Sequence, residues 1–409
     1  MQTHLASWAQ DTDFGRDADE ILRRCVHCGF CLATCPTYQI LGDERDSPRG
    51  RIYLIKQVLE GAELTAETQT HLDRCLTCRN CETTCPSGVQ YGSLVDIGRN
   101  LVDRKVTRPP GQRIVRWLLR HTLNSRWFGP AFRLGRLVRP VLPAVLKAKI
   151  PAFRPAGAIP SGTTHERNVL LLAGCVQPTM MPSIDAATIR VLDALGIGVR
   201  VEAGAGCCGA INFHLDAQAQ ALDQMRANID AWLPLLDSGA VEAIVMNASG
   251  CGAMVKEYAH HLRNDPDYVA KALRVVDKVR DVAEIVAPHA DMLKAMLGAL
   301  PPRTAFHPPC TLQHWQGLRG ISERLLADLG FDPLPFAESH LCCGSAGTYS
   351  VTQPELSKSL RDRKLDHIQS VRPDCIVSSN IGCIGHLQSG TDIPVRHWIE
   401  VVDEALARA

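Results

Sequence analysis

The sequence predicts a multidomain protein in which a helical domain is followed by a basic linker and an α/β tandem repeat. Three observations lead to this fold class. Two cysteine runs of identical spacing lie near the N-terminus, a stretch without acidic residues follows them, and cysteines then recur at a fixed offset among alternating strand and helix patterns. We therefore expect a helical domain over 1–103, a linker over 104–165, and two repeats over 166–295 and 300–409.

The helical domain is organised around the two cysteine runs, which both read C-x2-C-x2-C-x3-C-P. Thiolate is a soft ligand that suits iron–sulfur clusters, and in runs of this spacing the fourth cysteine ligates the other cluster. Zinc is the alternative, but zinc sites usually show two ligands, a long gap and two more. We therefore predict two [4Fe–4S] clusters. Their predicted ligands are Cys25, Cys28, Cys31 and Cys85 for the first, and Cys75, Cys78, Cys81 and Cys35 for the second.

Helices are predicted before both runs and between them. Residues 16–24 form a short helix that leads into the first run. Ser47 is suited to cap a second helix, whose apolar residues recur at helical spacing, and Gly61 ends it. A third helix over 65–74 leads into the second run. Helices rather than strands between the runs indicate a helical ferredoxin domain instead of the small β-rich kind.

Arg49 and Arg51 lie in the first turn of the helix that Ser47 caps. One interpretation is that they steer a partner or screen the charge of a cluster. The other is that they are solvated or paired with a carboxylate, which is the commoner situation for charged side chains.

The linker from Arg104 to His165 contains thirteen lysines and arginines and no aspartate or glutamate. Apolar residues recur among them at roughly helical spacing, with breaks predicted at Pro130, Pro140 and Pro143. The pattern is typical of an interfacial amphipathic segment, whose apolar face enters the headgroup layer while the basic residues meet anionic lipid. The alternative is a linker that packs on an acidic surface of the same protein or of a partner subunit. A nucleic-acid partner is not expected, because no binding module surrounds the stretch.

The tandem repeat is marked by four cysteines that recur in each copy. Three of them return after 135 residues and the fourth after 132. Each copy begins with a strand pattern, continues with a helix and the triplet Cys-Cys-Gly, and closes with a further strand. This alternation predicts a mostly parallel sheet, and residues just past the strand ends lie where ligands bind in such sheets. The recurring pairs are Cys175 and Cys310, Cys207 and Cys342, Cys208 and Cys343, and Cys251 and Cys383.

At least one copy is predicted to hold a further metal centre or a redox-active thiol site. The second copy is the better candidate, because His307, His340 and His386 lie near its cysteines in the sequence and offer substitute ligands. The alternative is that both copies are scaffolds whose buried cysteines behave as small apolar residues.

A dinucleotide site is not expected. Residues 204–209 satisfy the pattern G-x-G-x-x-G, but the corresponding place in the second copy keeps only Cys-Cys-Gly. The strand that follows ends in Asn247, without the acidic residue that a ribose needs. The chain therefore shows no flavin or nicotinamide motif for a two-electron oxidation.

Composition and the lack of targeting signals indicate the cellular compartment of the protein. A formal net charge of +1 predicts no partner, and 17 cysteines in metal and redox patterns favour a reducing cytosol. The N-terminus has no basic run followed by an apolar one, and no stretch approaches the ~18 apolar residues of a membrane span. We expect a cytoplasmic protein that is peripheral on the inner face of the cell membrane if the linker binds lipid.

The cysteine runs, the stretch Ser47-Pro-Arg-Gly-Arg-Ile-Tyr-Leu and the paired Cys-Cys-Gly domains closely resemble the iron–sulfur subunits of glycolate oxidases. The similarity covers essentially the full length, including Pro394-Val-Arg-His-Trp-Ile-Glu. More loosely, the chain is similar to the iron–sulfur subunits of lactate and glycerol-3-phosphate dehydrogenases and to heterodisulfide reductase. It departs in one respect: the full motif of such cysteine-rich domains ends in C-x-x-C, and Ala248 and Asn380 stand where the first of these cysteines belongs.

The resemblance implies a role in electron transfer. FAD-containing flavoprotein subunits of the same complex would oxidise a 2-hydroxy acid, glycolate to glyoxylate, and the iron–sulfur subunit would pass the electrons to a membrane acceptor such as quinone. It also implies that the eight N-terminal cysteines are the cluster ligands, and that the chain alone is inactive on the hydroxy acid. The alternative function is a thiol–disulfide reductase of the heterodisulfide reductase type, acting at the Cys-Cys-Gly sites.

Overall fold

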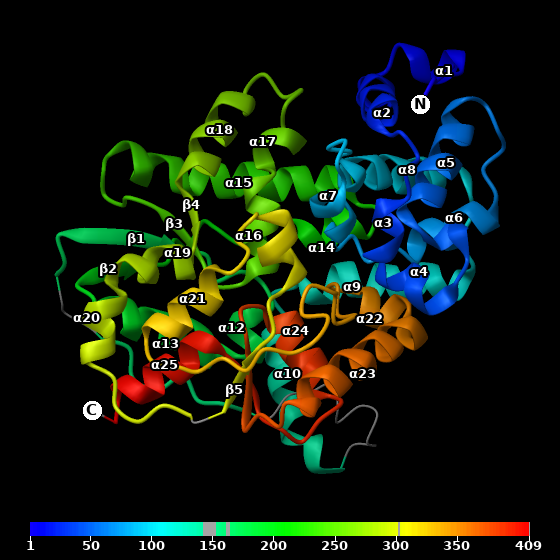
Figure 1. The fold of residues 1–409 in the computed structure, drawn as a ribbon. Coiled ribbons are helices and arrows are strands. Elements are labelled where there is room, and N and C mark those ends of the chain that lie inside the picture. The colour runs from blue at the N-terminus through cyan, green and yellow to red at the C-terminus, as the bar shows by residue number, and fades with distance from the viewer. Residues whose placement is uncertain (142–152, 161–163, 302, 409) are drawn as a thin grey trace. The chain divides into compact units, whose positions relative to one another are not determined.

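The structure is a computed structural model, traced from the N-terminus to the C-terminus in Figure 1. The residues that it describes are 1–141, 153–160, 164–301 and 303–408.

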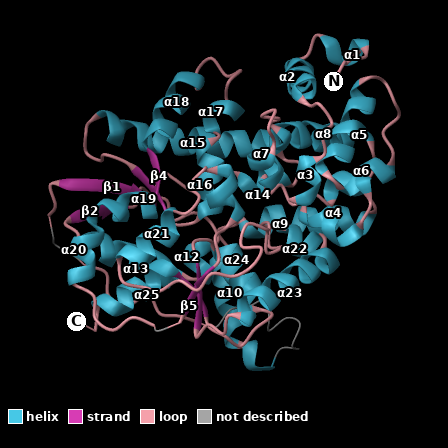
Figure 2. Cartoon of the chain, in the orientation of Figure 1, coloured by secondary structure: helices cyan, strands magenta, loops and turns pink. Residues whose placement is uncertain are grey.

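The chain forms two compact units. Unit 1 comprises residues 1–117 and 340–364, and unit 2 comprises residues 118–339 and 365–409. Both units contain helices, whereas every strand among the described residues belongs to unit 2 (Figure 2). The predicted fold class is confirmed, because a helical N-terminal region precedes an α/β region with parallel sheets.

All regular elements among the described residues of unit 1 are helices or helical turns. The helices α9 (Pro110–Leu123) and α23 (Pro354–Ser370) belong to it in part. Its other elements are α1 (Ser7–Gln10), α2 (Asp13–Arg24), α3 (Phe30–Ala33), α4 (Pro36–Leu41), the 3-10 turn η1 (Glu44–Asp46), α5 (Pro48–Leu59), α6 (Ala66–Asp73), α7 (Asn80–Thr84), α8 (Tyr91–Lys105) and α22 (Tyr349–Thr352).

Two of the helices around the cysteine runs begin where the sequence predicts, whereas α2 begins at Asp13, three residues before the expected start at 16. Ser47 Oγ accepts a hydrogen bond from the backbone N–H of Gly50 at 3.0 Å and so caps α5. Thr65 caps α6 in the same way, through the N–H of Thr68 at 3.2 Å. The three predicted helices before and between the runs are confirmed as α2, α5 and α6.

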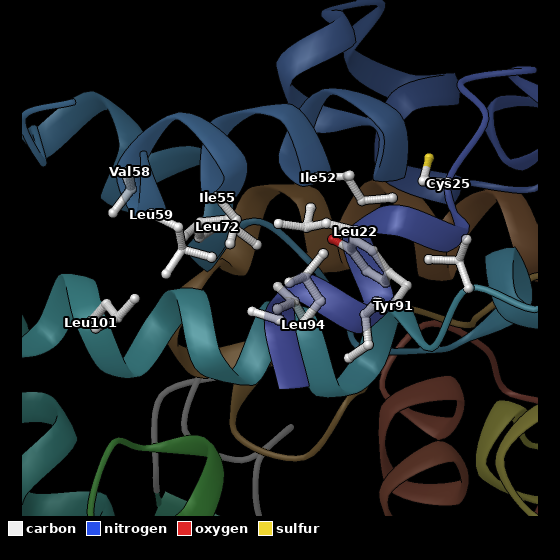
Figure 3. Packing of buried hydrophobic residues seen from close by; sticks show 14 of the residues in the cluster. Leu22, Cys25, Ile52, Ile55, Val58, Leu59, Leu72, Tyr91, Leu94 and Leu101 are labelled. Carbon is white, nitrogen blue, oxygen red and sulfur yellow. The ribbon is translucent and has the colours of Figure 1, made fainter. Parts of the chain in front are cut away.

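The core of unit 1 lies between these helices. Leu22 of α2, Ile55 and Leu59 of α5 and Leu94 of α8 are at most 1% exposed, and Figure 3 shows them gathered between the helices. Burying an aliphatic side chain of this size stabilises a fold by roughly 1.5–3 kcal/mol. Cys25 belongs to the same cluster, so helix packing fixes the start of the first cysteine run.

Unit 2 contains two sheets in which all pairings are parallel, as the repeat predicts. The first has the order β2-β1-β3-β4 and pairs Val169 with Val199, and the second has the order β5-β6-β7 and pairs Ala305 with Ile376. The central strands are apolar because helices cover parallel sheets on both faces. The strands are β1 (Arg167–Leu171), β2 (Ile197–Arg200), β3 (Ile244–Met246), β4 (Val279–Asp281), β5 (Thr304–Phe306), β6 (Cys375–Ser378) and β7 (Val395–His397).

The remaining helices belong to unit 2. In each repeat a longer helix lies between the first strand and the Cys-Cys-Gly triplet, as predicted: α13 ends at Ala194 and α21 ends at Asp328. The elements are α10 (Phe128–Leu137), η2 (Arg139–Val141), α12 (Gln177–Met180), α13 (Pro182–Ala194), α14 (Ala210–His214), α15 (Gln218–Asp237), α16 (Ser249–Lys256), α17 (Tyr258–His261), α18 (Val269–Lys278), α19 (Val282–Val286), η3 (Ala287–His289), α20 (Ala290–Ala295), η4 (Thr311–Trp315), α21 (Ile321–Asp328), α24 (Ile381–Gln388) and α25 (Trp398–Leu406).

The basic linker forms α9, α10 and the turn η2. The predicted break at Pro130 is wrong, because Pro130 lies in the first turn of α10, where a backbone N–H has no helical partner to lose. The helices separate instead between Leu123 and Phe128. The predicted break at Pro143 lies outside the described residues. No helix in the described part of the chain is both long and apolar enough to cross a membrane.

Candidate metal centre

The two cysteine runs share one backbone conformation. His27 and Gly29 of the first run have φ angles of 56° and 85°, and the corresponding Thr77 and Arg79 of the second have 53° and 57°. A non-glycine residue in this left-handed region costs on the order of 1–3 kcal/mol, so the surrounding structure must impose it. In each run a short helix follows, α3 or α7, and carries the third cysteine.

The first predicted ligand set comes together at a cavity in unit 1. Cys25, Cys28, Cys31 and Cys85 line it together with Cys81, around about 430 Å³ of empty space that includes a part open to solvent. Burial raises the pKa of Cys25, and the nearby Cys85 and Cys28 raise it further. Burial likewise raises the pKa of Cys31 to about 11, with Cys25 close by. Cys85 therefore leaves its own run and lies with the first three cysteines.

The second predicted set comes together in the same reciprocal way. Burial raises the pKa of Cys81 well above its usual value, and Cys78, Cys75 and Cys35 lie near enough to add to the effect. Cys35, the last cysteine of the first run, thus lies with the second run. Cys75 Sγ also accepts a hydrogen bond from the hydroxyl of Tyr91 at 3.5 Å.

The two sites differ in exposure. Val26 and Phe30 of the first run are 67% and 61% exposed, and Cys28 between them is exposed as well. The corresponding Leu76 and Cys78 of the second run are 6% and 8% exposed. The first site therefore lies at the surface of unit 1, whereas the second is buried within it.

These residues fit iron–sulfur clusters better than zinc. Backbone N–H groups of Thr77 and Val89 donate to Cys75 Sγ and Cys85 Sγ at 3.3 and 3.5 Å, and such bonds are typical of cluster ligands. Tetrahedral zinc with bonds of ~2.3 Å would hold its sulfurs roughly 3.8 Å apart. In the described part of the chain no three of the eight sulfurs lie within 4.8 Å of one another. This spacing suits a larger group.

A buried charged network lies beside the second set, and the sequence did not reveal it. Asp46 and Arg51 have side chains that are 0% and 1% exposed, and their nearest charged atoms are 3.3 Å apart. His71 Nδ1 and Arg74 Nη1 also reach Asp46, at 3.0 and 2.9 Å. Of the interpretations offered for Arg51, pairing with a carboxylate is therefore borne out. The aspartate directly before the capping Ser47 is the sequence signal that could have pointed to it.

The four thiols of the first repeat also come together, all within unit 2. Hydrogen bonds from Cys175 and Cys208 lower the pKa of Cys207, and the same contacts raise the pKa values of Cys175 and Cys208. Cys208 contacts Cys251 in turn, so the four side chains form a continuous row. Tyr258 holds this row in place, since its hydroxyl donates to Cys208 O at 2.9 Å.

The cysteines of the second repeat are divided between the units. Cys310 and Cys383 belong to unit 2, while Cys342 and Cys343 belong to unit 1. Asn380 stands in the place of the absent motif cysteine. Its Nδ2 donates a hydrogen bond to Cys383 Sγ at 3.5 Å. The second cysteine of the motif thus has an amide as its neighbour, where the full motif has another thiol.

The three histidines predicted as substitute ligands differ in position. His340 belongs to unit 1, and His386 lies on α24 in unit 2. His307 is 1% exposed, and a ring nitrogen lies within 4.8 Å of Cys383 Sγ in the same unit. Neither ring nitrogen of His307 has a hydrogen-bond partner among the described residues. His307 is therefore placed beside a thiol by the fold of unit 2.

The glycine of each Cys-Cys-Gly triplet is required by its backbone. Gly209 and Gly344 have φ angles of +93° and +86°. A Cβ at Gly209 would lie 3.2 Å from Ala221 O, and one at Gly344 would lie 2.5 Å from Ser357 O. At Gly344 the backbone therefore passes too close to a neighbouring helix for a side chain, and at Gly209 the left-handed φ angle itself disfavours one.

Two domain families match the chain in the regions just described. A 4Fe-4S dicluster domain matches residues 21–89, which contain both cysteine runs. A cysteine-rich domain matches twice, over residues 169–256 and 304–388. The chain therefore carries an iron–sulfur-binding domain followed by two cysteine-rich domains.

Relatives of the chain are found among bacterial proteins. The glycolate oxidase iron-sulfur subunit of Escherichia coli (strain K12) is 52% identical over 409 residues, which is all of both chains. The probable glycolate oxidase iron-sulfur subunit of Bacillus subtilis (strain 168) is 30% identical over 407 residues, covering 92% of this chain and 90% of the relative. Lactate utilization protein A of Geobacillus thermodenitrificans (strain NG80-2) is 27% identical over 245 residues, covering 58% and 98%.

Proposed function

Because this chain belongs to the family of glycolate oxidase iron–sulfur subunits, we propose that it relays electrons singly from a flavoprotein subunit to an acceptor at the membrane. One observation carries the proposal. The two cysteine runs interleave within unit 1: Cys85 of the second run lies near Cys25 of the first, and Cys35 of the first run lies near Cys81 of the second. This is the arrangement of a protein that holds two [4Fe–4S] clusters close together.

The chain's own residues would bind and orient both clusters. Cys85 and Cys35 cross between the runs, so each site depends on the fold of both. The proposed ligands are Cys25, Cys28, Cys31 and Cys85 for the first cluster, and Cys75, Cys78, Cys81 and Cys35 for the second.

The electron count requires such a relay. Oxidation of glycolate to glyoxylate removes a hydride from carbon and a proton from the hydroxyl group, which is two electrons and two protons. In the proposal the FAD of a partner subunit takes both electrons, since no flavin motif is found in this chain. A [4Fe–4S] cluster, when bound, accepts and returns one electron at a time. Two single transfers through this chain would then convert a quinone, with two protons, to the quinol.

Activity measurements with and without partners test the proposal. The purified chain, flavin-free by absorbance, should not oxidise glycolate. The chain combined with its flavoprotein subunits should support glycolate-dependent quinone reduction, and the flavoprotein subunits without it should not. If the isolated chain oxidises glycolate at rates comparable with the complex, the assignment as a relay subunit is wrong.

We further propose that α10, together with Arg126 and Trp127 directly before it, brings the complex to the cytoplasmic face of the membrane. Trp127, Leu134 and Leu137 are 66%, 63% and 78% exposed, and Arg126 and Arg133 lie among them. Exposed apolar side chains with neighbouring cations suit the headgroup layer of an anionic bilayer.

Other linker arginines are engaged within the protein. Arg108 and Arg116 pair with Asp73, and Arg154 pairs with Glu400 at 3.0 Å. For these three, the predicted alternative of packing on acidic residues of the same protein is confirmed. The lipid-binding proposal therefore rests on α10 and not on the whole linker.

The row of thiols in the first repeat supports a second candidate function, reduction of a disulfide. A thiolate at Cys207 would attack one sulfur of the substrate, and a neighbouring thiol would resolve the mixed disulfide, which releases two thiols and leaves a protein disulfide. Two electrons from the proposed relay would restore the thiols. Turnover of a disulfide by the full-length, dye-reduced chain, abolished in Cys207→Ser, would favour this function. If the unaltered chain does not turn over a disulfide, and the complex with Cys207→Ser keeps its full activity on glycolate, the first repeat is a scaffold.

A further inference from the structure

The second proposed cluster site has a buried cation directly behind its ligands. Arg51 is 1% exposed, and both of its Nη atoms donate to Thr37 Oγ1 at 3.2 Å. Thr37 Oγ1 lies 3.3 Å from Cys35 Sγ, so a single hydroxyl group separates the guanidinium from a proposed ligand. Cys75, from the same set, also lies within electrostatic reach of Arg51.

Arg51 shares its carboxylate with other groups. Asp46 is the carboxylate that faces Arg51, and it also faces Arg74 and His71. A second carboxylate, Asp43, lies within 4.8 Å of Asp46 and His71, but it is itself paired with an arginine. Because Asp46 is divided among three partners, it compensates the charge of Arg51 only in part. Since Arg51 and Asp46 are removed from water, the remaining charge acts at a low effective dielectric constant.

The first site has an arginine from the same helix in different surroundings. Arg49 Nη1 lies 3.4 Å from His27 O in the first run. Its side chain is 29% exposed, and Glu44 pairs with it at 2.6 Å. A charge that is partly solvated and paired is screened, so its influence on a nearby site is small.

We propose that Arg51 raises the reduction potential of the second [4Fe–4S] cluster and that Asp46 limits the effect. The inference rests on the proposed function, since it requires both clusters. Adding an electron makes a cluster more negative, and burial away from water opposes this step. A buried cation beside the ligands stabilises the added negative charge and so offsets the cost of burial. Arg51 would thereby allow the cluster at the buried second site to accept electrons that come from the flavoprotein subunit, as the cluster at the exposed first site does.

Redox titration of the full-length protein tests the inference. Protein purified without oxygen is assayed for iron and titrated with EPR detection, and a Cys28→Ser background reports the second cluster alone. Arg51→Met removes the cation at similar length, and Asp46→Asn removes the carboxylate but keeps an oxygen that accepts hydrogen bonds. We expect a lower potential for the second cluster with Arg51→Met and a higher one with Asp46→Asn. The matched control Arg49→Met should leave the second potential unchanged.

A purely structural role for the network would not produce shifts of opposite sign. The inference is overturned if the variants keep their iron and the second potential moves in neither, or moves in the same direction in both. If Arg51→Met does not fold, Arg51→Lys should retain a potential near the starting value, and Asp46→Asn must still raise it. Unaltered protein that binds zinc and no iron would contradict the proposed function instead, so the two failures are distinguishable.

Discussion

Cys35 and Cys85 are the residues on which the proposed relay depends most, because each joins the two cysteine runs. Their placement was predictable, since the spacing of the runs alone assigns the fourth cysteine to the other site. The residues around the sulfurs were not predictable. Thr37, Asp46 and Tyr91 contact the second set through the packing of α4, η1 and α8, and no local motif marks such contacts.

The crossing of the runs has a direct test in single substitutions. Cys35→Ser lies in the first run but should remove the second cluster, because its sulfur lies with Cys81. Anaerobically purified Cys35→Ser should therefore give the same residual EPR spectrum as Cys78→Ser, and each should lose about half of the roughly eight iron atoms of two cubane clusters.

Substitution of Cys85, the equivalent cysteine of the second run, supplies the control. Cys85→Ser should match Cys28→Ser and differ from Cys35→Ser. A spectrum of Cys35→Ser that matched Cys28→Ser would mean that each run holds its own cluster.

The triplet glycines provide a prediction about stability. Gly209→Ala and Gly344→Ala both place a side chain in the left-handed region, at a cost of about 1–2 kcal/mol. Gly344→Ala should destabilise more, because its Cβ would meet Ser357 O at 2.5 Å, against 3.2 Å from Ala221 O for Gly209→Ala. Thermal melting of both variants beside the unaltered protein measures the order. Equal loss in the two would show that the close approach at Gly344 relaxes without cost.

At the scale of helices and strands, the elements with a cap or a strong pattern were the predictable ones. The cap at Ser47, the helix after Thr65 and the strand patterns before Cys175 and Cys310 all lie where the sequence indicates. The error at Pro130 has a physical cause, since proline favours the first turn of a helix as much as it disfavours the interior. A proline therefore marks a helix start or a helix end, and periodicity alone does not decide between them.

The exposed face of α10 leads to a prediction for vesicle binding. Changing Trp127, Leu134 and Leu137 to serine should abolish flotation of the complex with anionic vesicles, and Arg126→Gln with Arg133→Gln should weaken it. Each basic residue near an anionic surface contributes about 1 kcal/mol, and rising salt screens the effect.

The control for this experiment removes charge elsewhere in the same unit. Lys271, Arg274 and Lys278 on α18 are side chains of comparable exposure, at 42%, 55% and 49%. Changing all three to glutamine should leave flotation intact. Equal flotation of the α10 variants and the control would assign the α10 face to contacts with protein.

The N-cap of α25 predicts a pH dependence of stability. His397 Nδ1 accepts from the N–H of Ile399 at 3.1 Å, and Nε2 lies 2.9 Å from Asn247 O. Burial lowers the pKa of His397 to about 4, from 6.5. Between these values the unfolded chain binds a proton that the folded chain does not. His397 therefore stabilises the fold fully above pH 6.5, and about 3 kcal/mol is lost as the pH falls to 4.

The substitution His397→Asn isolates this contribution. Asparagine also caps helices but does not titrate, so it removes the pH-dependent part and keeps the cap. The melting temperature of the unaltered protein should exceed that of His397→Asn at pH 7 by more than it does at pH 4. A difference that is the same at both pH values would contradict the buried, neutral state of His397.

At the scale of the whole molecule, the sequence predicts the order of domains better than their packing. The tandem repeat follows from the offset of four cysteines, and both sheets are parallel as the alternation requires. Residues 340–364, which include the second Cys-Cys-Gly triplet, group with the helical unit. Contacts such as Tyr349 Oη to Arg74 O, at 2.9 Å, hold this segment there. Such contacts join residues far apart in the chain, so no pattern within one segment reveals them.

The central claim is that electrons from a hydroxy acid reach this chain only through a flavoprotein partner and then reside on its two clusters. Rapid-freeze EPR after glycolate is mixed with the anaerobic complex measures this directly. We predict that signals of reduced, mutually interacting clusters appear in the complex and do not appear when glycolate is mixed with this chain alone. Glycolate-dependent signals from the isolated chain, or a complex in which glycolate reduces the flavin while the clusters stay oxidised, would contradict the account.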